Sequence, residues 1–480
     1  MEKLLYEGIR GIGRMIEEKE ISIVELTSYF LERNERLQPE YNMNTALLKD
    51  RALERAQALQ NEMEEKGVRG PLHGIPIAVK DLFDIEGLVN SSGSVFEKKK
   101  AEAHAAIIQK LEQAGANIIA LNNLHEYAMG STSENPHFGP IKNPWDPERI
   151  PGGSSGGSAV AVAIGSAVAT IGTDTGGSIR LPAALCGVVG FKPTYDVVSR
   201  EGCSPLSQSL DHIGPFARNV EDVRILLEAL KEVDLPDSRI EKKKETQPLK
   251  GVKIGVLEGY FLEGLHPDVT ARLEEAKSVF RSLGADILSL HLEDVDLALQ
   301  CQRIISKVEA YSNHSERFTE SAELFGKDVR YRLAQGRELK AYEYVQAKAF
   351  QKQFQEYVTE AMKLQGCDAV ISATNAIAPF IIDMERDAEQ SINNIFTLGK
   401  TSFGNFLGFP VVSVPCGLIE DRYPAGLQLM GLPKDDFTVL DITRLYEQES
   451  GWTSRLQRKL DKLMKERSEK NVAGALSSGS

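Results

Sequence analysis

The chain has 480 residues, of which 42% are hydrophobic, and its formal net charge is −13 at pH 7. This composition is typical of a globular protein with a large core, and the negative charge argues against sequence-independent binding of nucleic acid. The apolar stretches are too short or too interrupted for a signal peptide or a membrane span. We therefore expect a cytoplasmic protein that binds no membrane.

The N-terminal part of the chain predicts a helical arm over residues 1–65. Apolar residues recur at spacings of three and four over 22–37 and 44–65, where Ala, Leu and Glu are abundant. This periodicity is typical of amphipathic helices that pack one face against a core.

From residue 70 onward, short apolar runs alternate with helix-like segments. The segments 103–115 and 268–284 predict helices between strands, and this alternation indicates an α/β fold built on a central sheet. The last two predicted strands are close enough in sequence to form a hairpin. The predicted strands lie at 75–85, 116–124, 251–257, 285–290, 368–373, 409–417 and 425–431.

We expect one domain over residues 1–466. The charged, proline-containing segment 234–251 has no periodicity and predicts a surface connection. Strands and helices alternate in the same way on both sides of it, which argues against a domain boundary. The polar residues 467–480 predict a disordered tail.

The five cysteines are widely spaced with no CxxC pair, and the chain contains no HExxH motif. This pattern predicts reduced, mostly buried thiols rather than a disulfide framework or a zinc site. We expect neither a metal nor a cofactor.

Two tracts rich in glycine and serine lie close together, "PGGSSGGSAVAVAIG" from Pro151 and "GTDTGGSIRLP" from Gly172. A linker would not run directly into Ala, Val and Ile, and a phosphate-binding loop needs GxxxxGK[ST]. The residues around Ser154 satisfy the GxSxG pattern of a nucleophile elbow. However, the preceding prolines and charges exclude the strand that this motif requires.

The interpretation that remains is that both tracts contribute to one active site. Glycines let the backbone approach a substrate closely, and the amides before Ser178 would form a nest for a developing oxyanion. The alternative is a pair of tight turns whose hydroxyls are satisfied locally.

A serine nucleophile needs a base, and Lys80 is the most unusual candidate. It lies in a predicted apolar strand with Ile77 and Val79. If it is buried, desolvation lowers its pKa and leaves a neutral amine that can accept a proton, as in Ser–Lys variants of the catalytic triad. The alternatives are a lysine that reaches from the strand end to water, or a base at His73 or His212, which spacing does not link to either serine.

Residues 152–194, "GGSSGGSAVAVAIGSAVATIGTDTGGSIRLPAALCGVVGFKPT", resemble the signature segment of the amidase signature family nearly position by position. The resemblance extends to "GPLHGIPIAVKDLFDIEG", "YAMGSTSENPHFGPIKNPWDPERIPGG" and "LGFPVVSVPCG", and it covers most of the chain, to about residue 450. It implies the family's fold, a large, mixed and twisted β-sheet with helices on both faces, with the signature core at about 70–220.

The resemblance implies a Ser–Ser–Lys triad. Ser178 matches the nucleophile, Lys80 the general base, and Ser154 the serine that bridges them after a cis peptide bond. The chemistry of such a triad requires no cofactor or metal. The backbone amides of the oxyanion hole match Thr175, Gly176, Gly177 and Ser178.

Further residues match the family's motif around the triad. Asp174 and Arg180 are expected to brace the loop rather than to react. The loop that contains Met129, Gly130 and Ser131 is expected to line the substrate pocket together with the stretch 300–400.

The implied function is that of an amidohydrolase, which cleaves a carboxylic amide through an acyl-serine intermediate and releases ammonia or an amine. One branch of the family is the A subunit of glutamyl-tRNA(Gln) amidotransferase, a glutaminase, in which a segment resembling "SSNLARYDGVRYG" is expected. This chain instead has "EAYSNHSERFTESAELFGKDVRYR", and it has Asn394 where that branch tends to place an acidic residue that binds glutamine. These departures favour a free-standing amidase.

A function of a different class is that of a catalytically silent interaction module. Such a protein is expected to lack Lys80, Ser154 or Ser178, and all three are present. The expected partner is therefore a small-molecule amide rather than nucleic acid or a membrane, and a homo-oligomer is compatible with the sequence.

Overall fold

Eleven strands form one mixed sheet in the computed structural model, which describes residues 4–96, 100–240 and 247–478. Their order across the sheet is β1-β3-β2-β6-β8-β7-β12-β13-β11-β9-β10, and β4 and β5 form a separate small sheet. The strands are β1 (Asn44–Leu47), β2 (Pro76–Lys80), β3 (Asn117–Asn122), β4 (Glu134–Asn135), β5 (Gly139–Pro140), β6 (Ala169–Asp174), β7 (Val189–Lys192), β8 (His212–Ala217), β9 (Lys253–Leu257), β10 (Asp286–Leu290), β11 (Ala369–Ala373), β12 (Val411–Ile419) and β13 (Tyr423–Met430).

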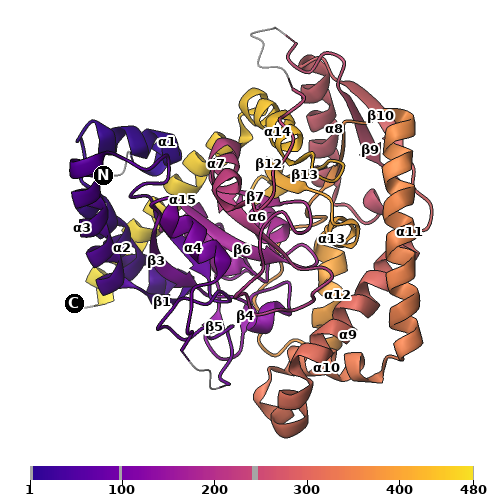
Figure 1. Ribbon diagram of the computed structural model, residues 1–480, viewed down its shortest axis with the longest axis horizontal. Helices are drawn as coiled ribbons and strands as arrows, with labels where there is room; N and C mark the ends of the chain where they lie inside the picture. The colour runs from indigo at the N-terminus through magenta and orange to yellow at the C-terminus, as the bar shows by residue number, and fades with distance from the viewer. Residues whose placement is uncertain (1–3, 97–99, 241–246, 479–480) are drawn as a thin grey trace.

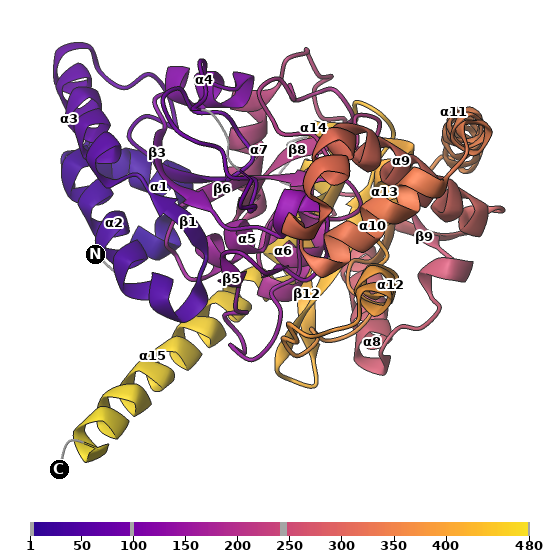
Figure 2. The same ribbon diagram turned by 90° about the horizontal axis from the view of Figure 1, so that it is seen from below.

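Helices cover both faces of this sheet (Figures 1 and 2). They are α1 (Leu4–Glu17), α2 (Ile23–Tyr41), α3 (Lys49–Lys66), α4 (Ala106–Gln113), α5 (Gly156–Ala163), α6 (Arg180–Cys186), α7 (Val220–Leu230), α8 (Pro267–Ser282), α9 (Val295–Ser321), α10 (Lys327–Glu338), α11 (Ala341–Gln365), α12 (Ala388–Leu398), α13 (Ser402–Leu407), α14 (Asp436–Ser450) and α15 (Trp452–Ser478), with short 3-10 turns at Glu126–Ala128, Gly259–Phe261 and Ala322–Leu324.

The sheet combines parallel and antiparallel pairs, as the predicted fold class requires. β2 pairs in parallel with both β3 and β6, whereas β12 and β13 form the predicted antiparallel hairpin. β2, β3 and β6 are buried along their whole length, which explains their nearly continuous apolar sequence, because helices cover both faces of a parallel region. The expected α/β fold with a large mixed sheet is confirmed.

The N-terminal arm is less purely helical than its periodicity predicts. The indigo helices α1, α2 and α3 lie together at one end of the molecule (Figure 1). Between α2 and α3, however, Asn44–Leu47 forms β1, which pairs antiparallel with β3. The helix predicted from residue 44 begins only at Lys49, because the edge of β3 offers backbone hydrogen-bond partners to the preceding residues.

The second half of the chain adds a group of helices beside the strands β9–β13. α9, α10, α11 and α12 lie together at one end of the molecule (Figure 1), with α9 in contact with α10, α11 and α13. The apolar core between α9, α11 and this part of the sheet contains Leu299, Ile305, Phe354 and Val370. This packing fixes the face of α9 that is turned toward the centre of the molecule.

The C-terminal segment continues α15, and the disorder expected of residues 467–480 stays a prediction. α15 continues to Ser478 and projects away from the body of the molecule (Figure 2). Its first turns are held by Leu456 and Leu460, which are buried in one apolar cluster with residues of α5 and α6. A helix anchored in this way propagates into residues of adequate helix propensity. Of the predicted surface connection 234–251, residues 241–246 lie outside the described residues. The helices that the structure describes include none with the length and apolarity to cross a bilayer.

Close backbone packing at Gly157 generates a stability prediction. A Cβ atom at this position in α5 would lie 2.3 Å from the carbonyl oxygen of Asn123 and 2.4 Å from that of Met43. Ala is ordinarily better than Gly in a helix by about 1 kcal/mol, but forced overpacking costs about 1–3 kcal/mol. We expect Gly157→Ala to lower the free energy of unfolding, as measured by denaturant titration. The control is Gly70→Ala, since no atom lies within 4 Å of a Cβ there; equal stability of the two variants would contradict the packing.

Candidate functional site

Lys80 is the last residue of β2 and lies at the carboxyl end of two parallel strands. Val79 pairs with Ile171 of β6, so the register brings Lys80 next to the end of β6. There its Nζ lies 2.8 Å from the Oγ1 of Thr173 and 2.8 Å from the Oγ of Ser154. The carboxyl ends of strands in α/β sheets are where ligands commonly bind.

The amine of Lys80 is completely buried. Burial lowers its pKa to about 7, and the opposing influence of Cys203, Asp211 and Asp174 is smaller than this desolvation. Within the described residues Lys80 forms no ion pair with a carboxylate. The amine is therefore neutral in a large fraction of molecules at neutral pH, and its hydrogen-bond partners are hydroxyls.

Ser154 lies in a tight backbone segment that precedes α5. The peptide bond between Gly153 and Ser154 is cis, as the resemblance implies. The hydroxyl of Ser133 donates to the carbonyl oxygen of Gly152 at 2.8 Å, and a Cβ at Gly153 would lie 2.8 Å from the same hydroxyl. The next amide, that of Ser155, donates to the carbonyl oxygen of Ser178 at 3.3 Å. The two glycine–serine tracts are thus brought together.

Asp174 and Arg180 brace the turn that carries Ser178. Arg180 donates from Nε and Nη2 to the two carboxylate oxygens of Asp174, each at 3.1 Å, and both side chains are fully buried. Burial alone would raise the pKa of Asp174, but this ion pair and a hydrogen bond from Asn405 hold that pKa below its ordinary value. The two residues therefore have the structural role that the sequence predicts.

Gly177 closes this turn, and its geometry changes one expectation. Its φ is +126°, and a Cβ would lie 1.9 Å from the Oγ1 of Thr401, so no other residue fits. Its amide donates to Asp174 at 2.7 Å, so this amide is not available to an oxyanion. The amides of Gly176 and Ser178, in contrast, donate to no acceptor in the part of the chain that the structure describes.

A cavity of about 90 Å³ lies over Ser178. Of the predicted substrate-binding residues, Met129, Gly130, Thr175 and Gly176 line it, whereas Gly177 and Ser131 do not. Ser131 is buried, and Gly177 faces Thr401. The full lining is Ala128, Met129, Gly130, Thr175, Gly176, Ser178, Leu206, Gln302, Arg303, Ser306, Lys307, Ala310, Arg332, Phe396 and Ser402.

Several residues of this site are not identified by the sequence. Thr173 directly precedes Asp174 at the end of a buried strand, and a hydroxyl at such a position is the signal that could have identified it. Arg303, Lys307 and Arg332 come from the stretch 300–400, which was expected to line the pocket, but single residues within it have no local motif. Asn394 does not line the cavity; it lies beside a separate hollow with Phe380 and Asp387.

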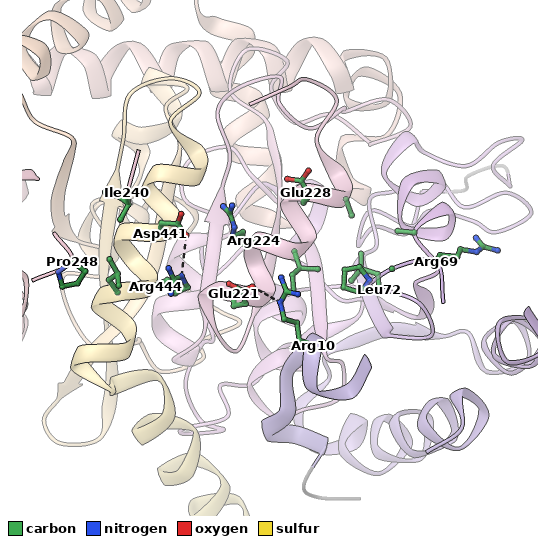
Figure 3. Close-up of a pocket in the computed structure, with 16 residues that line it drawn as sticks. Arg10, Arg69, Leu72, Glu221, Arg224, Glu228, Ile240, Pro248, Asp441 and Arg444 are labelled. Carbon is green, nitrogen blue, oxygen red and sulfur yellow. Dashed lines mark hydrogen bonds and ion pairs between the residues drawn. The ribbon is translucent and has the colours of Figure 1, made fainter. Parts of the chain in front are cut away.

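A larger cavity, of about 760 Å³, lies elsewhere, between α1, α7 and α14 (Figure 3). Two ion pairs lie within its lining: Arg10 with Glu221 at 3.0 Å, and Arg444 with Asp441 at 3.6 Å. Neither serine nor Lys80 lines it. Its size alone does not make it the candidate active site, because the contact between Lys80 and Ser154 lies outside it.

A family model described as "Amidase" matches residues 25–440 of this chain. Among curated proteins, the A subunit of glutamyl-tRNA(Gln) amidotransferase from Methanosarcina mazei is 37% identical over 473 residues, which cover 91% of this chain and 96% of that protein. The match extends over the strands, the turn and the helices that form the site.

Two solved structures have the same architecture. One described as a crystal structure of an amidase is 33% identical, with a TM-score of 0.83, and covers 92% of this chain and 99% of that one. The other, the A subunit of glutamyl-tRNA(Gln) amidotransferase from Thermotoga maritima, is 31% identical, with a TM-score of 0.72, and covers 89% and 92% of the two chains.

The burial of Lys80 predicts its titration. We expect its amine to titrate near pH 7, against about 10.4 for an ordinary lysine, because burial disfavours the charged form. The ¹³Cε chemical shift of lysine-labelled protein measures this directly, and the spectrum of Lys80→Met identifies the signal by its loss. A midpoint near pH 10 for that signal would show that the amine is charged at neutral pH and would contradict the geometry.

Proposed function

This chain belongs to the amidase family and cleaves C–N amide bonds, and from that premise we propose that Ser178, Ser154 and Lys80 carry the reaction. The observation that supports this assignment is the 2.8 Å contact between a buried lysine amine and the Oγ of Ser154, adjacent to the turn of Ser178. No other buried lysine contacts a serine hydroxyl among the described residues; Lys192 donates to the backbone carbonyls of Pro193 and Phe409.

The proposed reaction begins with two proton transfers. The neutral amine of Lys80 accepts the hydroxyl proton of Ser154 while one of its own N–H groups donates to Thr173. Ser154 takes the proton of Ser178, whose oxygen attacks the amide carbonyl carbon. The free amides of Gly176 and Ser178 donate to the resulting oxyanion.

Collapse of the tetrahedral intermediate breaks the C–N bond. Ser154 returns its proton to the departing nitrogen and is reprotonated by Lys80, so the amine leaves neutral and Ser178 remains acylated. Water then attacks the ester, with the same relay accepting its proton, and releases the carboxylic acid. This cycle consumes one water and regenerates all three groups.

For the natural substrate we propose glutamine first, with the chain as the glutaminase component of a glutamyl-tRNA(Gln) amidotransferase. The near-complete match to curated A subunits supports this, and it reverses the preference for a free-standing amidase that the departures in sequence suggest. The small cavity suits an amino-acid amide, and the guanidinium of Arg332 in its lining suits a carboxylate. In this proposal the other components of the amidotransferase are the partners, and the protein functions in the cytoplasm.

A free-standing amidase is the second candidate, and one observation favours it. The lining of the cavity contains no Asp or Glu among the described residues, whereas the α-ammonium of glutamine needs an acceptor. Asn394, the neutral residue where an acid is expected, also lies outside the cavity. An amide that carries a carboxylate but no ammonium group needs no such acceptor.

Ammonia release by the purified chain separates the two candidates. Glutamine is compared with glutaramate, which has the same amide and carboxylate but no ammonium. As the glutaminase component, the chain is expected to prefer glutamine and to accelerate when the other amidotransferase components, tRNA and ATP are added. Faster release from glutaramate, unaffected by these additions, would replace the first candidate by the second.

Substitution of Ser178 tests the nucleophile. Ser178→Ala is expected to lower kcat/KM by roughly 10⁴-fold or more, because residues that act as one catalytic unit fail together. A phosphonyl fluoride should label the wild-type chain once, at Ser178, as located by peptide mass spectrometry. Ser155→Ala is the matched control, since the Ser155 hydroxyl donates to the carbonyl of Thr173 rather than to the triad, and it should still be labelled. Labelling at Ser154 would contradict the assignment.

A further inference from the structure

Three cations line the small cavity over Ser178. Arg303 and Lys307 lie four residues apart on α9, and Arg332 extends from α10. Arg332 is held in place by a hydrogen bond of 2.6 Å from its Nη1 to the carbonyl oxygen of Met129, which also lines the cavity. The proposed nucleophile and three cationic side chains thus line the same cavity.

Arg303 and Lys307 have no acidic partner in the described ranges of the chain. The guanidinium of Arg303 lies 3.7 Å above the ring of Phe396, and its buried Nε has no hydrogen-bond acceptor. The amine of Lys307 makes neither a hydrogen bond nor an ion pair there. Burial lowers the pKa of both groups, and the neighbouring charges of Arg303 and Arg332 lower that of Lys307 further.

This arrangement is unfavourable unless an anion is present. Like charges four residues apart on a helix repel each other, and partial burial strengthens that repulsion because the local dielectric is lower. In the larger cavity of Figure 3, Arg10 and Arg444 each have a carboxylate partner within 4 Å, whereas Arg224 lies over the ring of Phe437 at 4.4 Å. The stacking of Arg303 on Phe396 orients its guanidinium but brings no carboxylate of the described residues within ion-pair distance.

We propose that Arg303 and Lys307 form an anion-binding subsite that selects, as substrates, small aliphatic amides carrying a carboxylate. The proposal rests on the proposed amide cleavage at Ser178 and applies to either candidate function. The carboxylate lies between the two α9 cations and Arg332, which directs the amide at the other end of the molecule toward Ser178. The bidentate guanidinium of Arg303 fixes the orientation, and Lys307 contributes a point charge.

The test compares two amides of equal length, glutaramate and pentanamide, which differ by a carboxylate in place of a methyl group. We expect the wild-type ratio of kcat/KM, glutaramate over pentanamide, to exceed about 100 and to fall about tenfold or more in Arg303→Gln and in Lys307→Gln, as the loss of a charged hydrogen bond implies. The fall should come mainly from a higher KM for glutaramate. Lys307→Arg, which keeps the charge, should retain most of the ratio.

Arg10→Gln is the matched control, since it removes an arginine of the larger cavity, and it should keep the wild-type ratio. A wild-type ratio near one, or substitutions at Arg303 and Lys307 that change both substrates equally, would overturn the subsite while leaving the amidase chemistry intact. Failure of the proposed function has a different signature: no hydrolysis of either amide by the wild-type chain, or retention of activity in Ser178→Ala.

Discussion

The burial of one amine, that of Lys80, is the constraint around which the active site is organised. The register of β2 against β6 fixes its position, and the surrounding strands exclude water from it. Because its pKa in the folded chain is about 7 and that of an unfolded lysine is about 10.4, the unfolded chain binds the extra proton between these values. Stability therefore falls as the pH is lowered from 10.4 toward 7. The same burial that destabilises the folded chain leaves the amine of Lys80 able to act as a base at neutral pH.

The other parts of the site fix the hydroxyls of Ser154 and Ser178 and the backbone amides of Gly176 and Ser178 near that base. Ser154 is held by the close packing of its tract against Ser133, and Ser178 by a turn that only glycine at 177 permits. The buried pair of Asp174 and Arg180 would be costly if either partner were missing, but here it fixes the direction of the turn. The carboxylate of Asp174 also accepts a hydrogen bond from the amide of Gly177. The amides of Gly176 and Ser178 are therefore the ones that can donate to an oxyanion.

Sequence predicts much of this framework, because its signals are local. The strands that become β2, β3, β9, β12 and β13 are apolar runs of the right length, and the two glycine–serine tracts mark the turns. It fails where long-range contacts decide: residues 44–47 pair with the edge of β3 instead of extending a helix. The cations of α9 and α10 have no local motif either, since only tertiary packing brings residues 303 and 332 to one cavity. In the proposed subsite, the packing of α9 against α10 therefore determines which amides the cavity selects.

The central claim is that neutral Lys80 is the general base, and the pH dependence of single-turnover acylation tests it most directly. An activated ester or anilide keeps residual rates measurable in both the wild-type chain and Lys80→Ala. Wild-type acylation should fall as the pH drops through about 7, because the protonated amine no longer accepts a proton from Ser154. Lys80→Ala should be slower by about 10²- to 10⁴-fold and should lose this acid limb. The same acid limb in Lys80→Ala would show that another group is the base and would contradict the account.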